Sequence, residues 1–227
     1  VTGTRHIVDA CLHNQVQLLV HVSTPSVYFD YSDRLQISER LPLPRKAVNH
    51  YAATKRMAEQ IVFEAHRSGL PSIIIRPRGI FGPGDSSLLP RLIRANDSGG
   101  IPVFRDGLIR MDLTYVDNVV DALLLCASAP PSALGAAYNI TNHEPIIFIH
   151  ALEQLFAYLD QPLHLRKISY PTAIAAARWL EWKAHLLRSR EEPLFTRYSI
   201  GLLAKHQTLD PSLAIEQLVY SPRIGIS

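Results

Sequence analysis

Long apolar runs are missing from this sequence. A membrane-spanning helix needs about 18 to 20 consecutive apolar residues, and no such run occurs. The nearest segment, residues 171–187, is interrupted by Arg178, Glu181 and Lys183, so it is typical of an amphipathic helix. The first residues also lack the charged and apolar pattern of a secretory leader. We expect a chain with neither a leader nor a transmembrane segment.

Cysteine is scarce, and metal-binding spacings are missing. The two cysteines, Cys11 and Cys126, each lie in an apolar helical pattern. Buried free thiols are typical of a reducing compartment, which predicts a cytoplasmic protein. The ten histidines show no HExxH or similar spacing, so no metal site is predicted.

Charge of one sign is not concentrated anywhere in the chain. The 23 lysines and arginines are scattered among 20 aspartates and glutamates, and the net charge is +3. Proteins that bind nucleic acid usually carry a basic patch or stripe, so no nucleic-acid partner is predicted. The 227 residues, 47% of them hydrophobic, are ordinary for one globular domain with or without an added lobe.

The glycine-rich fingerprint of dinucleotide-binding turns is absent as well. Gly79, Gly82 and Gly84 lie close together, but their spacing is GxxGxG, and a proline follows the second glycine. The fingerprint requires GxGxxG between a strand and a helix. We therefore interpret these glycines as shaping a turn within residues 78–85.

The sequence does contain an alternation of helical and strand patterns. Residues 3–13 have apolar positions at helical spacing, and LLVHV at 18–22 is typical of a buried parallel strand. A loop rich in Ser, Asp and Pro is expected over residues 23–47. A helix over 49–68 and a strand over 72–76 follow. This alternation predicts an α/β fold with a doubly wound parallel sheet.

The pattern changes after residue 85, where shorter elements follow one another. A helix is predicted to begin with Asp117 as its N-cap, and its apolar stripe is Val120, Leu123 and Leu124. The other elements expected are strands over 101–104, 110–116 and 136–140 and helices over 88–96, 148–159 and 171–187.

Tyr51 and Lys55 lie four residues apart in the expected helix, in the stretch YAATK. Positions i and i+4 share one helix face, so the phenol and the ammonium point the same way. A nearby cation favours the ionised form of a phenol and so makes it a better acid or base. The alternative is a solvated helix face, because such a short motif also arises by chance.

A second polar group, Ser23 and Thr24, directly follows the expected strand at 18–22. Open α/β sheets build their sites at the carboxyl ends of their strands. The Thr24 hydroxyl can there orient a substrate oxygen while Tyr51 transfers the proton. The alternative is ordinary turn chemistry.

Taken in order, these pieces resemble the extended short-chain dehydrogenase/reductase superfamily. The similarity rests on LLVHVSTPSVY, YAATKRMAEQ, IIIRPRGIFGPGD and MDLTYVDNVVDALLL, and it covers nearly the whole chain. Within the superfamily, the sequence is most similar to the 3β-hydroxysteroid dehydrogenase-like branch, which includes sterol-4α-carboxylate 3-dehydrogenases.

The resemblance implies a role for each matching residue. Tyr51 is implied to be the acid/base, Lys55 to lower the pKa of Tyr51 and bind the nicotinamide ribose, and Thr24 to complete the catalytic set. Asp117 and Asn118, in the YVDN element, are implied to be structural. The residues implied to bind the cofactor, NAD or NADP, are Val22, Ser23, Tyr51, Lys55, Pro77, Gly79 and Ile80.

The resemblance also implies a Rossmann-like architecture that is incomplete at its N-terminus. The strand and TGxxGxxG turn that open the superfamily's fold are absent here, so a first portion of about 60 to 90 residues is expected to be missing. Residues 1–85 are assigned to the C-terminal part of the dinucleotide-binding domain. Residues 86–227 form mainly a smaller substrate lobe, with 111–140 returning to the Rossmann sheet.

The implied function is NAD(P)-dependent oxidation or reduction of a secondary alcohol. The apolar lobe, with Trp179 and Trp182, favours a hydrophobic small molecule such as a 3β-hydroxysteroid or sterol. The alternatives are a nucleotide-sugar epimerase or dehydratase of the same fold, or a truncated fragment without catalysis. A homodimer through the helices at 3–13 and 49–68 is a further implication. The sequence leaves open the substrate, the choice of NAD or NADP and the direction of reaction.

Overall fold

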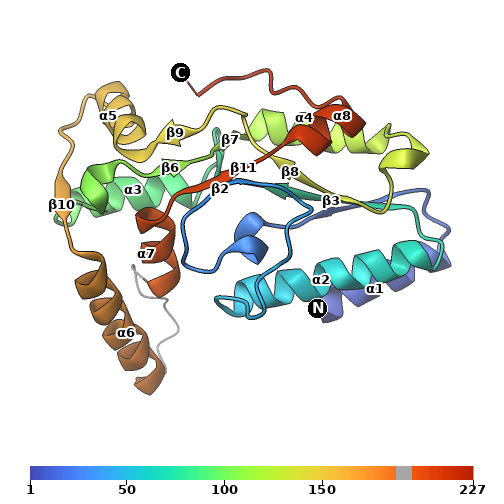
Figure 1. The fold of residues 1–227 in the computed structure, drawn as a ribbon, viewed down its shortest axis with the longest axis horizontal. Coiled ribbons are helices and arrows are strands. Elements are labelled where there is room, and N and C mark those ends of the chain that lie inside the picture. Colours follow the sequence, from blue (N-terminus) through green and yellow to red (C-terminus); the bar gives the residue numbers. More distant parts are fainter. Residues whose placement is uncertain (188–195, 227) are drawn as a thin grey trace.

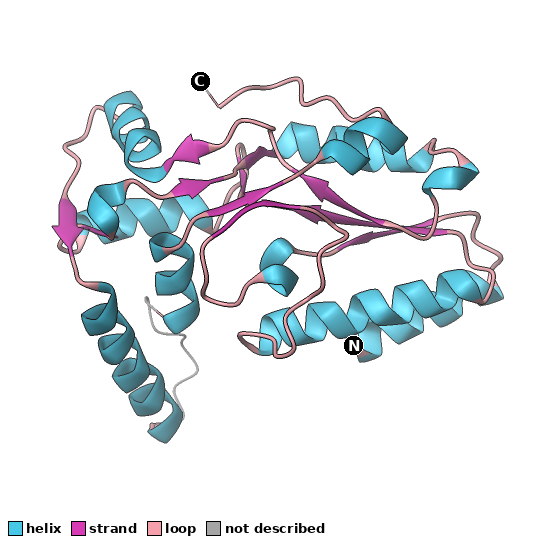
Figure 2. Cartoon of the chain, in the orientation of Figure 1, coloured by secondary structure: helices cyan, strands magenta, loops and turns pink. Residues whose placement is uncertain are grey.

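The computed structural model describes residues 1–187 and 196–226, and these form an α/β protein (Figures 1 and 2). Its centre is a parallel sheet in the order β1-β3-β8. Leu19 pairs with Ser72, and Ile74 pairs with Ala137. The three strands are β1 (Leu19–Val22), β3 (Ser72–Pro77) and β8 (Ala137–Ile140).

Helices cover both faces of this sheet (Figure 1). Alternate residues of β3 point to opposite faces, as in any strand. Ile73 and Ile75 pack in one core with residues of α4 and α8, whereas Ile74 packs against Val62 of α2. The predicted doubly wound sheet is therefore confirmed. The covering helices are α1 (Thr2–His13) and α2 (His50–Arg67) on one face and α4 (Val116–Ala127) and α8 (Ser212–Leu218) on the other.

A second group of short strands links the sheet to the lobe. One of its sheets has the order β2-β11-β6-β9, and two further pairs are β4 with β7 and β10 with β5. Of the segment 111–140, β8 joins the central sheet, whereas β7 pairs with β4. The strands are β2 (Arg34–Ile37), β4 (Ile80–Phe81), β5 (Ile101–Val103), β6 (Arg110–Met111), β7 (Thr114–Tyr115), β9 (Ile146–Ile147), β10 (Leu165–Lys167) and β11 (Gln207–Leu209).

The lobe has cores of its own. Phe148, Leu152 and Phe156 of one helix pack with Ile101 and Val103 of β5. None of the helices within 1–187 and 196–226 is both long and apolar enough to cross a bilayer. The lobe helices are α3 (Leu88–Asp97), α5 (Phe148–Tyr158), α6 (Tyr170–Leu186) and α7 (Arg197–Ala204), and the short 3₁₀ turns of the chain are Pro25–Tyr28, Arg105–Gly107 and Pro131–Ala133.

The expectation of a plain loop over residues 23–47 is wrong. The segment contains the 3₁₀ turn Pro25–Tyr28 and the strand β2. The partner of β2 is β11, which lies about 170 residues later in the chain. Pairing with so distant a strand leaves no local signal in the sequence.

The start and the buried face of α4 also differ from expectation. The N-cap is Tyr115, and Asp117 lies inside the first turn. Val119, Ala122 and Cys126 face the core, whereas Val120 and Leu124 of the expected stripe are largely exposed. Apolar residues occur on both sides of this helix, so the pattern by itself does not decide which side is buried.

Arg76 in β3 forms a fully buried ion pair with Glu59 of α2. Arg76 Nε and Nη2 lie 2.8 and 2.6 Å from Glu59 Oε1 and Oε2. Arg76 Nη1 donates to the Tyr28 hydroxyl, which in turn donates to Asn139 Oδ1 at 3.0 Å. Burial would lower the pKa of Arg76, but the Glu59 carboxylate and the Tyr28 phenol raise it overall. This network ties α2, the 3₁₀ turn and β8 to the centre of the sheet.

Candidate active site

The start of α2 positions Tyr51 beside the sheet. Asn49 caps the helix, because its Oδ1 accepts a hydrogen bond from Ala52 N at 2.8 Å. Tyr51 therefore lies in the first turn, with 48% of its surface exposed. One turn later, Lys55 Nζ donates to the Val22 carbonyl at 3.0 Å. Since Val22 is the last residue of β1, Tyr51 and Lys55 lie at the carboxyl end of the parallel sheet.

Thr24 follows the same strand end and caps the 3₁₀ turn Pro25–Tyr28. Its Oγ1 accepts from Ser26 N at 3.2 Å and lies 3.0 Å from Ser26 Oγ. Ser26 Oγ is also hydrogen-bonded to the hydroxyl of Tyr198 from α7. Thr24 therefore does take part in turn chemistry. It also begins a chain of hydroxyl groups that leads into the lobe.

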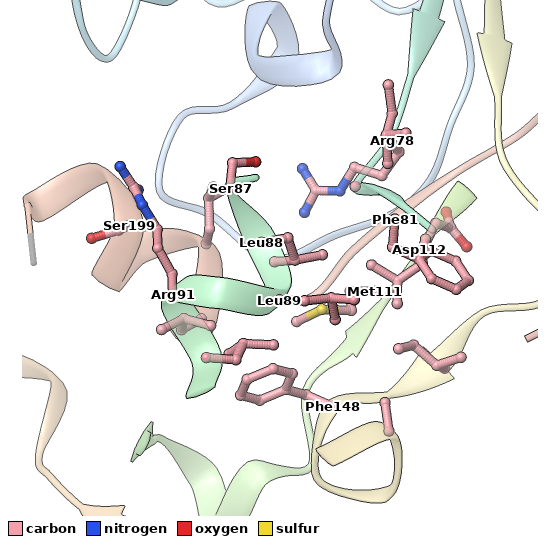
Figure 3. A pocket seen from close by; sticks show the side chains of 18 of the residues that line it. Arg78, Phe81, Ser87, Leu88, Leu89, Arg91, Met111, Asp112, Phe148 and Ser199 are labelled. Carbon is pink, nitrogen blue, oxygen red and sulfur yellow. The ribbon is translucent and has the colours of Figure 1, made fainter. Parts of the chain in front are cut away.

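A cavity of about 620 Å³ lies between the sheet end and the lobe (Figure 3). Thr24, Tyr51, Pro77, Gly79 and Ile80 line it together, so five of the predicted site residues share one space. Much of the remaining wall is apolar and comes from lobe residues that include Leu88, Leu89, Leu92, Leu152, Phe148 and Met111.

Val22, Ser23 and Lys55 lie beside this cavity rather than in its wall. The Val22 carbonyl is the acceptor for Lys55. Ser23 is buried, and its Oγ has no hydrogen-bond partner among the residues that the structure describes. An unmet buried hydroxyl is costly unless something binds to it.

Gly79 is required by the turn after β3. Its φ is +53°, and an added Cβ would lie 2.8 Å from Leu113 Cδ2 and 3.1 Å from the Asp112 carbonyl. A side chain at this position would therefore clash with Asp112 and Leu113, in the short connection between β6 and β7. This geometry confirms the turn-shaping interpretation of Gly79.

The polar wall residues that were not singled out from the sequence include Arg78, Asp112 and Tyr198. Arg78 is 9% exposed, and Figure 3 shows its guanidinium projecting into the cavity. Burial lowers the pKa of Arg78, while Tyr198 and Asp112 act in the opposite direction. The RPRG stretch does place two arginines in alternate positions. Nothing local distinguishes the paired one from the one that faces the cavity.

Asp112 and Tyr198 line the same cavity as this arginine and act on its charge. Burial raises the pKa of Asp112 to about 6, although Leu209 N donates to its Oδ2 at 2.6 Å and Arg78 also lowers it. Burial raises the pKa of Tyr198 as well. Tyr198 comes from α7, about 150 residues after Tyr51, so only the tertiary structure reveals its place here.

Trp179 and Trp182 do not contribute to the cavity, contrary to expectation. Both project from α6 with more than half of their surface exposed, and neither belongs to the cavity wall. The side of α6 that packs on the lobe is its small-residue side, with Ala173 and Ala177 buried. The apolar character of the cavity comes from α3 and α5 instead.

The strand ends fit the nicotinamide half of a dinucleotide. The free Ser23 hydroxyl can donate to a carboxamide oxygen, and Lys55 keeps two of its three N–H groups for ribose hydroxyls. Within residues 1–187 and 196–226, no strand-to-helix turn has the glycine spacing that cradles a pyrophosphate. In the same ranges, no three His, Cys, Asp or Glu side chains lie together as metal ligands.

Solved structures of dinucleotide-dependent enzymes share this fold. UDP-glucuronic acid 4-epimerase from Bacillus cereus, solved in complex with NAD, superimposes with a TM-score of 0.71 at 21% identity, covering 98% of this chain and 62% of that one. dTDP-glucose 4,6-dehydratase from Bacillus anthracis, also in complex with NAD, gives 0.70 at 18% identity, covering 99% and 62%. At these identities the likeness confirms the Rossmann-like α/β fold.

Sequence relatives are more similar than these structures. A 3beta-hydroxysteroid-dehydrogenase/decarboxylase of Arabidopsis thaliana is 37% identical over 238 residues, covering 100% of this chain and 54% of that protein. A 2-alkyl-3-oxoalkanoate reductase of Shewanella oneidensis is 31% identical, covering 100% and 61%. A sterol-4-alpha-carboxylate 3-dehydrogenase of Schizosaccharomyces pombe is 30% identical, covering 100% and 68%. The chain thus spans about half to two thirds of their length.

The family model for the 3-beta hydroxysteroid dehydrogenase/isomerase family matches residues 1–169. This range contains the whole central sheet, Thr24, Tyr51, Lys55 and the turn after β3. The match and the relatives agree with the resemblance drawn from the sequence motifs. The chain belongs to the 3-beta hydroxysteroid dehydrogenase/isomerase family.

Proposed function

We propose that the protein containing this chain is an NAD(P)-dependent oxidoreductase that acts on the CH–OH group of a hydrophobic secondary alcohol or on the corresponding ketone. The observation that carries the proposal is that Tyr51 and Thr24 line one largely apolar cavity at the carboxyl end of a parallel sheet. Lys55 is held on the Val22 carbonyl at the same edge. This is where open α/β sheets place their ligands.

Each residue of the set has a distinct part in this proposal. In oxidation, Tyr51 takes the proton of the substrate hydroxyl, and in reduction it returns a proton to the carbonyl oxygen. Thr24 orients that oxygen with its hydroxyl, which Ser26 holds in place. Lys55 brings a positive charge to the same helix face and has N–H groups free for the ribose. When bound, the nicotinamide accepts or supplies the hydride.

The cavity wall supports a hydrophobic substrate. Leucines of α3 and α5 form much of the surface opposite the sheet end, together with Phe148 and Met111. Apolar walls with a few placed polar groups are typical of sites for small apolar molecules. A sterol or a long-chain ketone matches this lining better than a nucleotide sugar, whose hydroxyl groups need many polar partners.

The test is Tyr51→Phe in the full-length protein. The variant keeps the ring and loses the proton, so we expect kcat/KM to fall by about 10²- to 10⁴-fold for every substrate turned over. Tyr115→Phe is the matched control, because Tyr115 packs edge-on against Phe81 outside the cavity wall. Near-normal turnover by Tyr51→Phe would sink the assignment.

A binding experiment separates the proposed function from nucleotide-sugar chemistry. Titration calorimetry of the wild-type protein with UDP- and dTDP-sugars should show no binding at millimolar concentration. Micromolar binding of either sugar nucleotide would favour an epimerase or dehydratase instead.

A further inference from the structure

Residues 221–226 follow α8 and run back over the start of α4 toward β9 (Figure 1). Within this segment, Ile226 N donates to Glu144 Oε2 at 3.0 Å. Glu144 lies two residues before β9, whose first residue, Ile146, lines the cavity. Of residues 221–226, Ile226 alone belongs to the cavity wall. The segment therefore brings one apolar side chain to a wall whose other residues lie between positions 24 and 203.

Two buried asparagines hold the backbone of this segment. Asn118, in the first turn of α4, accepts at Oδ1 from Arg223 N at 3.0 Å and from Ile224 N at 3.1 Å. Its Nδ2 donates to the Ile224 carbonyl at 2.8 Å and to Asn142 Oδ1 at 2.7 Å. Asn142 Nδ2 donates to the same carbonyl at 3.0 Å. An asparagine amide has two N–H groups and one oxygen with two lone pairs, so Asn118 is fully bonded.

These contacts act on the backbone of the segment rather than on its side chains. The Ile224 side chain is exposed, and the ion pair of Arg223 with Asp121 lies at the surface, where such pairs contribute little to stability. The two asparagines are buried, and a buried amide is costly unless it is hydrogen-bonded. The segment is therefore held in one path by groups inside the protein, and that path decides where Ile226 lies.

The same pair of asparagines also holds a second wall residue, Leu113. Asn142 N donates to the Leu113 carbonyl at 3.1 Å, and the Leu113 side chain lines the cavity. Leu113 also lies against Gly79 in the turn after β3, since a Cβ on Gly79 would be 2.8 Å from Leu113 Cδ2. The asparagine pair thus fixes Ile226 and Leu113, two apolar residues of one wall, relative to each other.

We propose that Ile226 is a specificity-determining residue that limits the width of the substrate's apolar part, and that Asn118 is a positioning residue that keeps Ile226 in the wall. The inference rests on the proposed function, because it assumes that an apolar substrate binds in this cavity. Its physical basis is close packing: a wall held in place excludes extra volume, whereas a wall that can move gives way. The hydrogen bonds from Asn118 to the segment are what hold this part of the wall.

The first test compares the binding of a wide and a narrow ketone. 5α-Androstan-3-one and 2-dodecanone are titrated into the full-length protein together with NAD or NADP, the oxidised cofactors, which cannot reduce a ketone. A change of one methylene in a hydrophobic pocket alters selection by about 10- to 200-fold. We expect Ile226→Trp to weaken binding of the ring ketone relative to the chain ketone by about that factor, and Ile226→Ala to shift the ratio of the two Kd values the other way.

Ile224→Trp and Ile224→Ala are the matched controls, because Ile224 is the same residue type in the same segment but lies outside the cavity wall. They should leave the ratio unchanged, and a thermal melt checks that each variant is folded. An unchanged ratio in folded Ile226→Trp would overturn the proposal. So would the same shift in Ile224→Trp, or binding of neither ketone by the wild type.

A second test asks whether Asn118 acts through Ile226. Asn118→Ala removes four hydrogen bonds, so Ile226 is no longer held and the Kd ratio should move toward that of Ile226→Ala. In the double variant the two changes should not add, since both remove the same restraint. Asn118→Asp keeps the acceptor for Arg223 N and Ile224 N and should retain part of the selection. Wild-type selection in both folded Asn118 variants, or full additivity, would show that Asn118 does not position Ile226.

Turnover by Tyr51→Phe separates this inference from the proposed function. If Tyr51→Phe stays active while Ile226→Trp still shifts the Kd ratio, the proposed chemistry fails and the role of Ile226 stands. If Tyr51→Phe is inactive and Ile226→Trp leaves the ratio unchanged, only the role of Ile226 fails.

Discussion

Two arginines of one strand end, Arg76 and Arg78, have opposite surroundings. Arg76 lies inside β3, points toward α2 and is paired with both oxygens of Glu59. Arg78 lies one residue beyond the end of the strand, and its guanidinium projects into the cavity (Figure 3). Both residues are arginines, they lie only two positions apart in the chain, and both side chains are buried. The difference lies in what the tertiary structure places opposite each charge.

This comparison separates a charge that is paired within the protein from one that is not. A buried cation with a bidentate carboxylate is satisfied within the protein, and breaking the pair leaves an uncompensated charge. A buried cation beside a cavity, with no hydrogen-bond or ion-pair partner in the described part of the chain, keeps its N–H groups for water or for a molecule in the cavity. Substitutions of the two arginines should therefore affect the stability of the fold to different extents.

The largest expected effect on stability comes from breaking the buried ion pair of Arg76 with Glu59. Arg76→Met should lower the free energy of unfolding by about 3–5 kcal/mol, because Glu59 then stays buried without a cation. Urea unfolding of the full-length protein measures the loss. Adding Glu59→Leu should restore most of the stability, since the second change removes the stranded carboxylate. A loss below about 1 kcal/mol in the single variant would show that the ion pair of Arg76 and Glu59 contributes little to the stability of the fold.

The next effect concerns Asp112, the carboxyl group beside Arg78. Its pKa is about 6 in the folded protein and near the usual value of about 4 when unfolded, so folding takes up a proton between these values. Stability therefore falls as the pH rises from about 4 to about 6, by on the order of 2 kcal/mol for this group.

The measurement is urea unfolding of Asp112→Asn across this pH range. The variant should show a flatter profile, because asparagine does not titrate. Asp117→Asn, which changes an exposed carboxyl on α4, controls for the loss of charge alone. A wild-type profile that Asp112→Asn does not change would mean that other groups take up the proton.

A smaller effect concerns the first turn of α2, which carries Tyr51, whereas the middle of the helix carries Glu59, the partner of Arg76. Asn49→Ala removes the cap on Ala52 N and should cost about 1 kcal/mol of stability. The cap lies next to Tyr51, whereas Glu59 lies more than two turns further on. We expect turnover to fall more than the stability loss alone explains, while Asn49→Asp retains both. Equal turnover in Asn49→Ala and the wild type would show that the cap does not position Tyr51.

The smallest expected effect on stability comes from replacing Arg78, the arginine of the cavity wall. Arg78→Met should lower the free energy of unfolding by no more than about 1 kcal/mol, because no ion pair among the described residues is broken. The same urea experiment as for Arg76→Met measures it. A loss as large as that of Arg76→Met would show that Arg78 is structural, and would remove the contrast between the two residues.

The alternation of helices and strands was predictable because its signals are local. LLVHV and SIIIR are short apolar runs that suit strands with both faces buried, and they form β1 and β3. Asn49 and the residues after it carry a cap and a helical pattern, and they form α2. The shared helix face of Tyr51 and Lys55 follows from the same periodicity.

Elements that depend on distant partners were not predictable. β2 exists because β11 pairs with it, and Tyr198 enters the cavity because α7 packs beside the end of the sheet. The buried side of α4 was misjudged because both of its sides carry apolar residues. In each case the deciding contact joins positions far apart in the sequence.

The sequence by itself determined the α/β class, the order of the central elements and the shared helix face of Tyr51 and Lys55, because periodicity and spacing act over a few residues. The tertiary structure alone decided that Glu59 neutralises Arg76 while Arg78 faces a cavity. It also decided that leucines of α3 and α5, rather than the tryptophans of α6, line that cavity. Whether a buried charge is paired within the protein depends on which side chain lies opposite it, and that depends on how the whole chain folds.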